Sequence, residues 1–115
     1  MAIRRAAPGL DAIFGALSDP TRRGMIALLA GSERSATELG ARFRISQPAA
    51  SKHIRTLERA GLVARRVEGR VHRFSLRAKP LQEAEAWIAR HRKFWEASLE
   101  SLDRLLTGME GERRD

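Results

Sequence analysis

The sequence has 115 residues, a formal net charge of +8, three histidines and no cysteine. A chain of this length builds one small core, so we expect a single domain over residues 1–115. The absence of cysteine excludes disulfides and thiolate metal sites. Nine Lys or Arg stand against two Glu between residues 46 and 79, so the positive charge is concentrated there. This localised charge predicts an anionic macromolecular partner.

Neither a membrane protein nor an enzyme is indicated. No apolar run is long enough to span a bilayer, and no apolar stretch of signal-peptide length precedes Asp11, which predicts an untargeted cytoplasmic protein without a membrane partner. The chain has no glycine-rich phosphate loop and no recognisable acid-base motif. We therefore assign no catalytic residue and expect no cofactor.

Two short helices are predicted before the central motif. Residues 1–8 are expected to form an arm, after which apolar residues at helical spacing indicate a first helix over 10–17. Asp19 fits the N-cap of a second helix. Arg22 and Arg23 near that N-terminus are expected to be solvent-exposed, because the positive end of a helix dipole does not stabilise cations.

Residues 35–61 predict a helix-turn-helix. Ser35 followed three residues later by Glu38 fits a capping box, which predicts a helix over 36–43. Ser46 fits the N-cap of a second helix, and a proline in the first turn and a glycine at the end agree with that assignment. A short turn separates the two helices.

The second helix has a packing face and a free face. A period of 3.6 residues places Ala50, Ile54 and Leu57 on the packing face. The opposite face carries small, hydroxyl and cationic side chains, which suits entry into a DNA major groove, although an ordinary solvated face has the same composition. The helix residues that we assign to DNA binding are Ser46, Gln47, Pro48, Ser51, Lys52 and Arg55, with Ser46 mainly a cap that also meets phosphate.

Residues 62–77 predict a β-hairpin wing. Two runs with partial alternation flank Glu68-Gly69, which fits a tight turn. Five arginines make the hairpin strongly basic. Arg70 at the tip is the expected wing contact with phosphate or the minor groove, and His72 is also assigned to the DNA-facing set.

Three segments carry a resemblance to a known family: SDPTR at 18–22, SQPAASKHIRTL at 46–57 and AGLV at 60–63. Together they resemble the ArsR family of bacterial winged-helix repressors, over roughly residues 17–76. The resemblance implies a homodimeric transcriptional regulator, usually a repressor that releases its operator on a signal. Many members carry a Cys-x-Cys metal motif after Glu-Leu; the matching run from Glu38 to Arg42 lacks it, which places the chain with members that lack this motif.

A last helix is predicted over 80–107, with Gly108 as its stop. Its broad apolar band is too long for a small domain to cover, which predicts dimerisation through this helix and the helix over 10–17. Packing of the band on its own domain is the alternative. The expected dimer-interface residues are Ile13, Phe14, Trp87, Ile88, His91, Trp95, Leu99 and Leu102.

No metal site is assigned. His91 stands alone among arginines and carboxylates on the last helix, and His53 lies near the packing face of the second helix of the motif. Both are expected to be packing residues. The aromatic side chains of the last helix are interpreted as packing too, and we assign no small-molecule effector.

The resulting prediction is a mainly α (α+β) winged helix-turn-helix with about five helices, a two-stranded hairpin wing and a homodimeric assembly. Its expected partner is double-stranded DNA, which it binds at an inverted-repeat operator as a repressor. The alternative is a winged helix that binds DNA without sequence preference or serves as a protein-interaction module.

Overall fold

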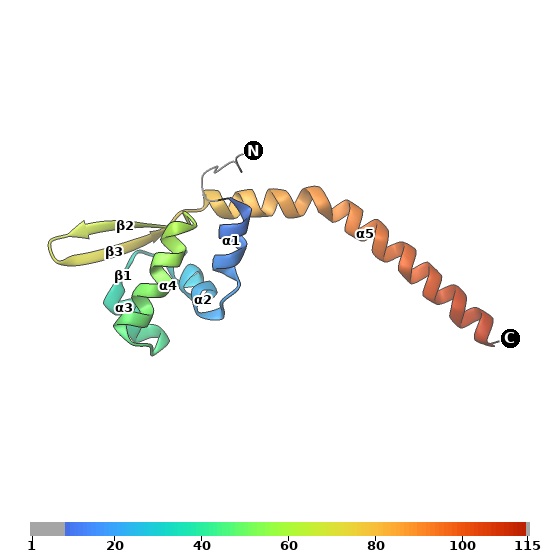
Figure 1. Ribbon diagram of the computed structural model, residues 1–115, viewed down its shortest axis with the longest axis horizontal. Coiled ribbons are helices and arrows are strands. Elements are labelled where there is room, and N and C mark those ends of the chain that lie inside the picture. The colour runs from blue at the N-terminus through green and yellow to red at the C-terminus, as the bar shows by residue number, and fades with distance from the viewer. Residues whose placement is uncertain (1–8, 115) are drawn as a thin grey trace, which may run out of the picture. The chain divides into compact units, whose positions relative to one another are not determined.

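The computed structural model describes the backbone of residues 9–114 and the side chains of residues 9–110; the arm expected over residues 1–8 lies outside them. The elements in chain order are α1 (Leu10–Leu17), α2 (Pro20–Leu29), β1 (Arg34–Ser35), α3 (Ala36–Phe43), α4 (Gln47–Arg59), β2 (Val63–Glu68), β3 (Val71–Leu76) and α5 (Lys79–Arg114) (Figure 1). The described chain divides into two compact units after Ala84. The first unit holds α1–α4, the sheet and the start of α5, and the second holds α5 from Glu85 onward.

Side-chain caps fix the starts of three helices, as the sequence predicted. The carboxylate of Asp19 accepts a hydrogen bond from the Arg22 amide at 3.0 Å at the start of α2. Ser35 and Glu38 form a complete capping box at α3, with distances of 3.1 and 3.0 Å. The hydroxyl of Ser46 accepts from the Ala49 amide at 3.2 Å at α4. These bonds satisfy amides that have no partner within the helix.

Left-handed residues end the two helices of the central motif. Arg44 follows α3 with φ of 55°, and Gly61 follows α4 with φ of 76°. The Gly61 amide donates to the Glu58 carbonyl and the Leu62 amide to the Leu57 carbonyl, both at 2.9 Å. This pair of bonds is the Schellman arrangement, and it directs the chain from α4 into β2.

The core of the first unit lies between the helices and one face of the sheet. The predicted packing face of α4 is confirmed, because Ala50, Ile54 and Leu57 are all buried. Helices α2 and α3 approach closely where the Phe43 ring lies against Gly24, since a Cβ at position 24 would lie 2.6 Å from Cε1 of Phe43. The buried cluster consists of Ala16, Met25, Leu29, Leu39, Ala50, Ile54, Leu57, Ala60, Leu62, Val63 and Phe74.

The predicted hairpin is present, and a third strand joins it. Strands β2 and β3 pair antiparallel from Val63↔Leu76 to Glu68↔Val71, and Gly69 has the positive φ, 64°, that the two-residue turn needs. Strand β1 pairs with β3, so the strand order is β1-β3-β2. The sequence predicts only the two-stranded wing, because the two residues of β1 are too few to show alternation. In Figure 1 the hairpin projects beyond the helices of the first unit.

Helix α5 continues beyond the predicted stop. The expected end at residue 107 is wrong, because Gly108 lies inside the 36-residue helix. An internal glycine costs a helix only about 1 kcal/mol relative to alanine. Good helix formers on both sides, such as Leu106 and Glu110, offset that cost. Among the helices of residues 9–114, none combines the length and the apolar character needed to cross a membrane.

Candidate nucleic-acid interface

Helix α4 presents an exposed cationic ridge on the side opposite the core. Pro48, Lys52, Arg55 and Arg59 are exposed, and Ser51 is half-buried beside them. The exposed positions recur at helical spacing because Ala50, Ile54 and Leu57 orient the helix by their burial. The face predicted from the sequence is therefore the face that the fold leaves open.

The N-terminus of α4 is held by two predicted DNA-binding residues. Ser46 has the cap role already described, with its Oγ bound to the Ala49 amide. The side chain of Gln47 lies over Gly40 of α3, so closely that a Cβ at position 40 would collide with the Gln47 amide nitrogen. Gln47 therefore helps to pack the two helices of the motif against each other.

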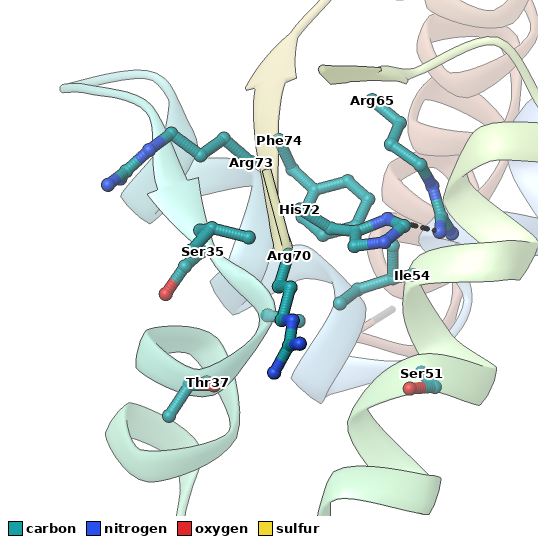
Figure 2. Close-up of a pocket in the computed structure, with 11 residues that line it drawn as sticks. Ser35, Thr37, Ser51, Ile54, Arg65, Arg70, His72, Arg73 and Phe74 are labelled. Carbon is teal, nitrogen blue, oxygen red and sulfur yellow. Dashed lines mark hydrogen bonds between the residues drawn. The ribbon is translucent and has the colours of Figure 1, made fainter. Parts of the chain in front are cut away.

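Two hollows flank the exposed ridge of α4. A cleft of about 540 Å³ lies between α3, α4 and the hairpin, and a smaller one of about 290 Å³ lies between α2 and α4. Ser51 lines the first cleft and Lys52 the second. In Figure 2 the side chain of Arg70 reaches from the hairpin tip toward the space between Thr37 of α3 and Ser51 of α4. The first cleft thus brings two predicted site residues, Ser51 and Arg70, to one surface.

The arginines of the wing are largely paired with carboxylates, which their count in the sequence does not show. Arg65 binds Glu58 of α4 through two parallel hydrogen bonds of 3.0 and 2.7 Å. This contact raises the pKa of Arg65 above its usual value. Since Glu58 is the single acidic residue of α4, its pairing leaves the helix surface cationic.

A second cluster of ion pairs lies around Arg66. Its guanidinium binds Glu33 at 2.6 Å and Glu68 at 2.7 Å. Hydrogen bonds from Arg66 hold the pKa values of both carboxyl groups below their usual range, and the Glu33 carboxylate in turn raises the pKa of Arg66. Arg73 adds longer contacts, 3.6 Å to Glu68 and 3.9 Å to Glu38. Three of the five wing arginines therefore already hold carboxylates.

Helix α4 and the hairpin tip carry cations that remain available. Within the described chain, Lys52, Arg55, Arg59 and Arg70 are exposed and their side chains make no ion pair or hydrogen bond with protein groups. His72 is half-buried, and its Nδ1 lies 2.9 Å from Nη1 of Arg65. The structure therefore separates the predicted wing residues: Arg70 is free, whereas His72 has a partner inside the protein.

The solvent exposure predicted for Arg22 is wrong. Its guanidinium is half-buried and donates to the carbonyls of Ala16 and Gly15, at 2.7 and 3.2 Å, at the end of α1. Arg23 is exposed as predicted, but its Nη1 donates to the Leu17 carbonyl at 2.8 Å. The prediction of exposure rested on the dipole at the start of α2 alone. It missed the C-terminus of α1, whose free carbonyls attract these cations.

Comparison with known proteins identifies the family. A helix-turn-helix domain family matches residues 17–66. The chain is 33% identical over 79 residues to the transcriptional repressor SdpR of Bacillus subtilis (strain 168), which covers 69% of this chain and 88% of SdpR. The fold is similar to the crystal structure of an ArsR family transcriptional regulator, with a TM-score of 0.71, 36% identity and coverage of 76% and 96% of the two chains. The chain belongs to the ArsR family.

A second solved structure of an ArsR-like regulator has a similar fold. The ArsR-like transcriptional regulator from Rhodococcus sp. RHA1 has a TM-score of 0.69 and 29% identity, with coverage of 84% of this chain and 91% of that one. ArsR proteins are DNA-binding transcriptional regulators rather than enzymes, which fits the exposed cationic ridge. The winged helix-turn-helix predicted from the sequence is confirmed.

This ArsR chain has no cysteine, and glycine stands at position 40. The position that follows Glu-Leu in the run from Glu38 to Arg42 is Gly40, where even a Cβ meets Gln47. Among the described residues, no three His, Asp or Glu side chains converge in a way that could hold a metal ion. His53 instead lies with Nδ1 3.2 Å from Nη1 of Arg22.

The second unit carries the residues predicted for dimerisation on α5. The rings of Trp87, His91 and Trp95 follow one another along the helix, with centroids 4.3 and 5.9 Å apart, and His91 Nδ1 lies 2.8 Å from the Trp87 carbonyl. Trp87, Ile88 and His91 are half-buried, whereas Trp95, Leu99 and Leu102 are exposed. In the first unit, Ile13 is fully buried and Phe14 is half-buried.

Proposed function

We propose that this protein is a homodimeric repressor that binds an inverted-repeat operator and does not depend on a metal ion. The observation that carries the proposal is the surface of α4. Lys52 and Arg55 are exposed and unpaired within the described chain, while Glu58 is neutralised by Arg65. A helix of this size with free cations and no free carboxylate suits the major groove.

The DNA contacts divide by position. Gln47, Ser51, Lys52 and Arg55 are assigned to bases and nearby phosphates. Gln47 is included because the N-terminal residues of recognition helices reach base edges. Ser46 and Pro48 form the helix start, whose free amides favour a phosphate. Arg70 at the wing tip takes phosphate or the minor groove, and His72 lies on the same hairpin.

Dimerisation follows from the exposed apolar face of α5. Phe94 is 70% exposed and Leu99 is 64% exposed, which leaves a large apolar surface open in a single chain. A second copy that covers this face would relate two recognition helices by a two-fold axis. Such a dimer reads two half-sites about one helical turn of DNA apart. Because the two recognition helices are related by a two-fold axis, the half-sites form an inverted repeat.

Repression is supported by the function of a relative. SdpR of Bacillus subtilis is a transcriptional repressor, and this chain aligns with 88% of its length. A repressor needs only to occupy its operator, and the free cations of α4 and the wing suit that task. Independence from metal is supported by the lack of cysteine and by the finding that no three His, Asp or Glu side chains of the described residues converge.

A titration of the purified full chain tests the proposal. The two duplexes are the promoter upstream of its own gene and a scrambled sequence of equal composition, at physiological salt, with and without zinc. We expect a preference for the promoter of about 1,000-fold or more, unaffected by zinc. Affinity should also fall steeply as the salt concentration rises. The slope of log K against log salt should be several units negative, because several phosphates are neutralised.

Three results would contradict parts of the proposal. Equal binding to both duplexes would overturn the operator and favour DNA binding without sequence preference. No binding to either duplex would overturn the DNA function and favour a protein-interaction module. Release of the promoter by zinc would overturn independence from metal.

A further inference from the structure

Arg65 connects the recognition helix to both long strands of the wing. It lies on β2, directly opposite Phe74 of β3. Its Nε and Nη2 donate to the two oxygens of Glu58 on α4, and its third nitrogen, Nη1, lies 2.9 Å from Nδ1 of His72 on β3. The guanidinium carbon lies 5.0 Å from the centre of the Phe74 ring. Arg65 of β2 thus contacts two other elements, α4 and β3, and Figure 2 shows its contact with His72.

The hairpin has no other buried support near its tip. Val63 and Phe74 are buried at its base, but Val67, Glu68 and Val71 are exposed. Strand β1 pairs with β3 only at Arg73 and Phe74, so the tip is a two-stranded ribbon without a buried face, which is marginally stable in water by itself. The part of the hairpin that carries Arg70 therefore depends on side-chain ties to the rest of the unit.

Two such ties leave β2 in opposite directions. Successive side chains of a strand point to opposite faces, so Arg65 meets Glu58 of α4 while Arg66 meets Glu33 before β1. The Arg65 contact is the less exposed of the two, with 38% exposure of its side chain against 52% for Arg66. It is also the one that ends on the recognition helix.

We infer that Glu58, Arg65 and His72 form a clamp that fixes the wing at a set angle to α4 and so determines where Arg70 meets DNA. The inference rests on the proposed DNA-binding function. Arg65 and His72 are positioning residues, because their nitrogens are used inside the protein. Arg70 makes the contact. The two parallel Arg–carboxylate bonds suit this role, since they restrict orientation more than a single ion pair does.

We expect the clamp to contribute little to the folding stability of the protein. Partly exposed ion pairs contribute little to folding, and a bidentate geometry adds mainly directional restraint. The clamp should therefore be removable without unfolding the chain. The double variant E58Q/R65M removes one negative and one positive charge, so the net charge of the protein is unchanged. The matched control, E33Q/R66M, removes the tie on the other face with the same charge balance.

The first test measures the wing angle without DNA. Because the chain has no cysteine, spin labels can be placed at Arg59 of α4 and Val67 of β2 as a cysteine pair, diluted with unlabelled chain. We expect a narrow distance distribution in the unaltered background, a clearly broader one with E58Q/R65M, and a smaller change with E33Q/R66M. An equally narrow distribution at the same distance after E58Q/R65M would overturn the clamp.

The second test measures energetic coupling between the clamp and Arg70 on DNA. R70A should weaken binding in the unaltered protein and lower the salt slope by about 1. In the E58Q/R65M background the same change should cost at least about threefold less, because the tip is no longer held in place. In the E33Q/R66M background it should cost nearly as much as in the unaltered protein.

The outcomes separate this inference from the proposed function. Equal binding of the unaltered chain to promoter and scrambled duplex would overturn sequence-specific repression alone, since the coupling can then be measured on either duplex. An R70A effect that is equal in all three backgrounds would overturn the clamp alone, whereas an absent effect would overturn both the clamp and the DNA contact assigned to Arg70. The spin-label distances need no DNA at all, so they decide the angle whatever the DNA result.

Discussion

Nη1 of Arg22 lies 3.2 Å from Nδ1 of His53, and this contact joins the first turn of α2 to the recognition helix. The same guanidinium donates to two carbonyls at the end of α1. The His53 ring also lies 3.9 Å from the carboxylate of Asp19, which caps α2. Arg22 therefore connects three elements of the first unit, α1, α2 and α4, and through them supports the recognition helix α4.

Replacing Arg22 by alanine should destabilise the fold. The change removes the donors to the Ala16 and Gly15 carbonyls and leaves His53 without its partner, which should cost about 1 to 3 kcal/mol in the free energy of unfolding. Urea denaturation followed by circular dichroism measures it. R23A is the matched control, since Arg23 is exposed and makes a single bond to Leu17, and it should cost less than about 1 kcal/mol. Equal losses in the two variants would contradict the role of Arg22.

Gly24 and Gly15 should respond oppositely to alanine. A Cβ at position 24 would lie 2.6 Å from Cε1 of Phe43, whose ring packs against the core, so G24A should cost about 1 to 3 kcal/mol through overpacking. Nothing lies within 4 Å of a Cβ at position 15 in α1. G15A should therefore stabilise the protein by about 0.5 to 1 kcal/mol, since alanine is the better helix former. Thermal unfolding of both variants tests the pair, and stabilisation by G24A would show that the ring moves freely.

The fold could be predicted from the sequence because its local signals agree. Caps at Asp19, Ser35 and Ser46 each mark a helix start, and the period of the apolar residues gives the buried face of α4. These signals act between neighbours in the chain, so a sequence contains them directly. The end of α5 was missed for a related reason: Gly108 is a stop signal that the favourable residues around it override.

The candidate site could be predicted only in part. The exposed face of α4 follows from helical spacing, but the pairing of the wing arginines does not. Glu33 and Arg66 are 33 residues apart, and Arg22 and His53 are 31 apart, so no local pattern connects them. A count of basic residues therefore overstates the charge that the wing offers, and Arg70 emerges as its free cation at the tip only once the fold is known.

Arg55 is the clearest test of base recognition. It is exposed on α4 and makes no ion pair within the described chain, so R55A should weaken promoter binding by about 1 to 3 kcal/mol and change the sequence preference. R59A is the matched control, because Arg59 is exposed on the same helix one turn nearer its C-terminus. It should weaken binding to promoter and scrambled duplex alike. A uniform loss with R55A would identify Arg55 as a phosphate contact.

Acid should destabilise the protein through its capping carboxylates. The amide of Ser35 donates to Glu38 and lowers the pKa of that carboxyl, as the Arg22 amide does for Asp19. A carboxyl with a lowered folded-state pKa stabilises the fold above its unfolded pKa, about 4, and that stabilisation is lost as the pH falls toward the folded value. We expect the free energy of unfolding to drop below about pH 4. E38Q, whose amide oxygen can still accept the hydrogen bond, should lose less free energy of unfolding as the pH falls. Parallel curves of unfolding free energy against pH for E38Q and the unaltered protein would contradict this role of Glu38.

Trp95 tests the dimer. Its side chain is 40% exposed in the described chain and stands beside Leu99 and Leu102 on an open apolar face, where a second copy would bury it. Large aromatics at the centre of an interface dominate its energy, so W95A should shift the assembly from twice the chain mass of 12.9 kDa toward a single chain. Sedimentation equilibrium over a range of concentrations measures the shift. K93A, an exposed charge change two residues away, should leave the assembly unaltered, and an unchanged mass for W95A would remove Trp95 from the interface.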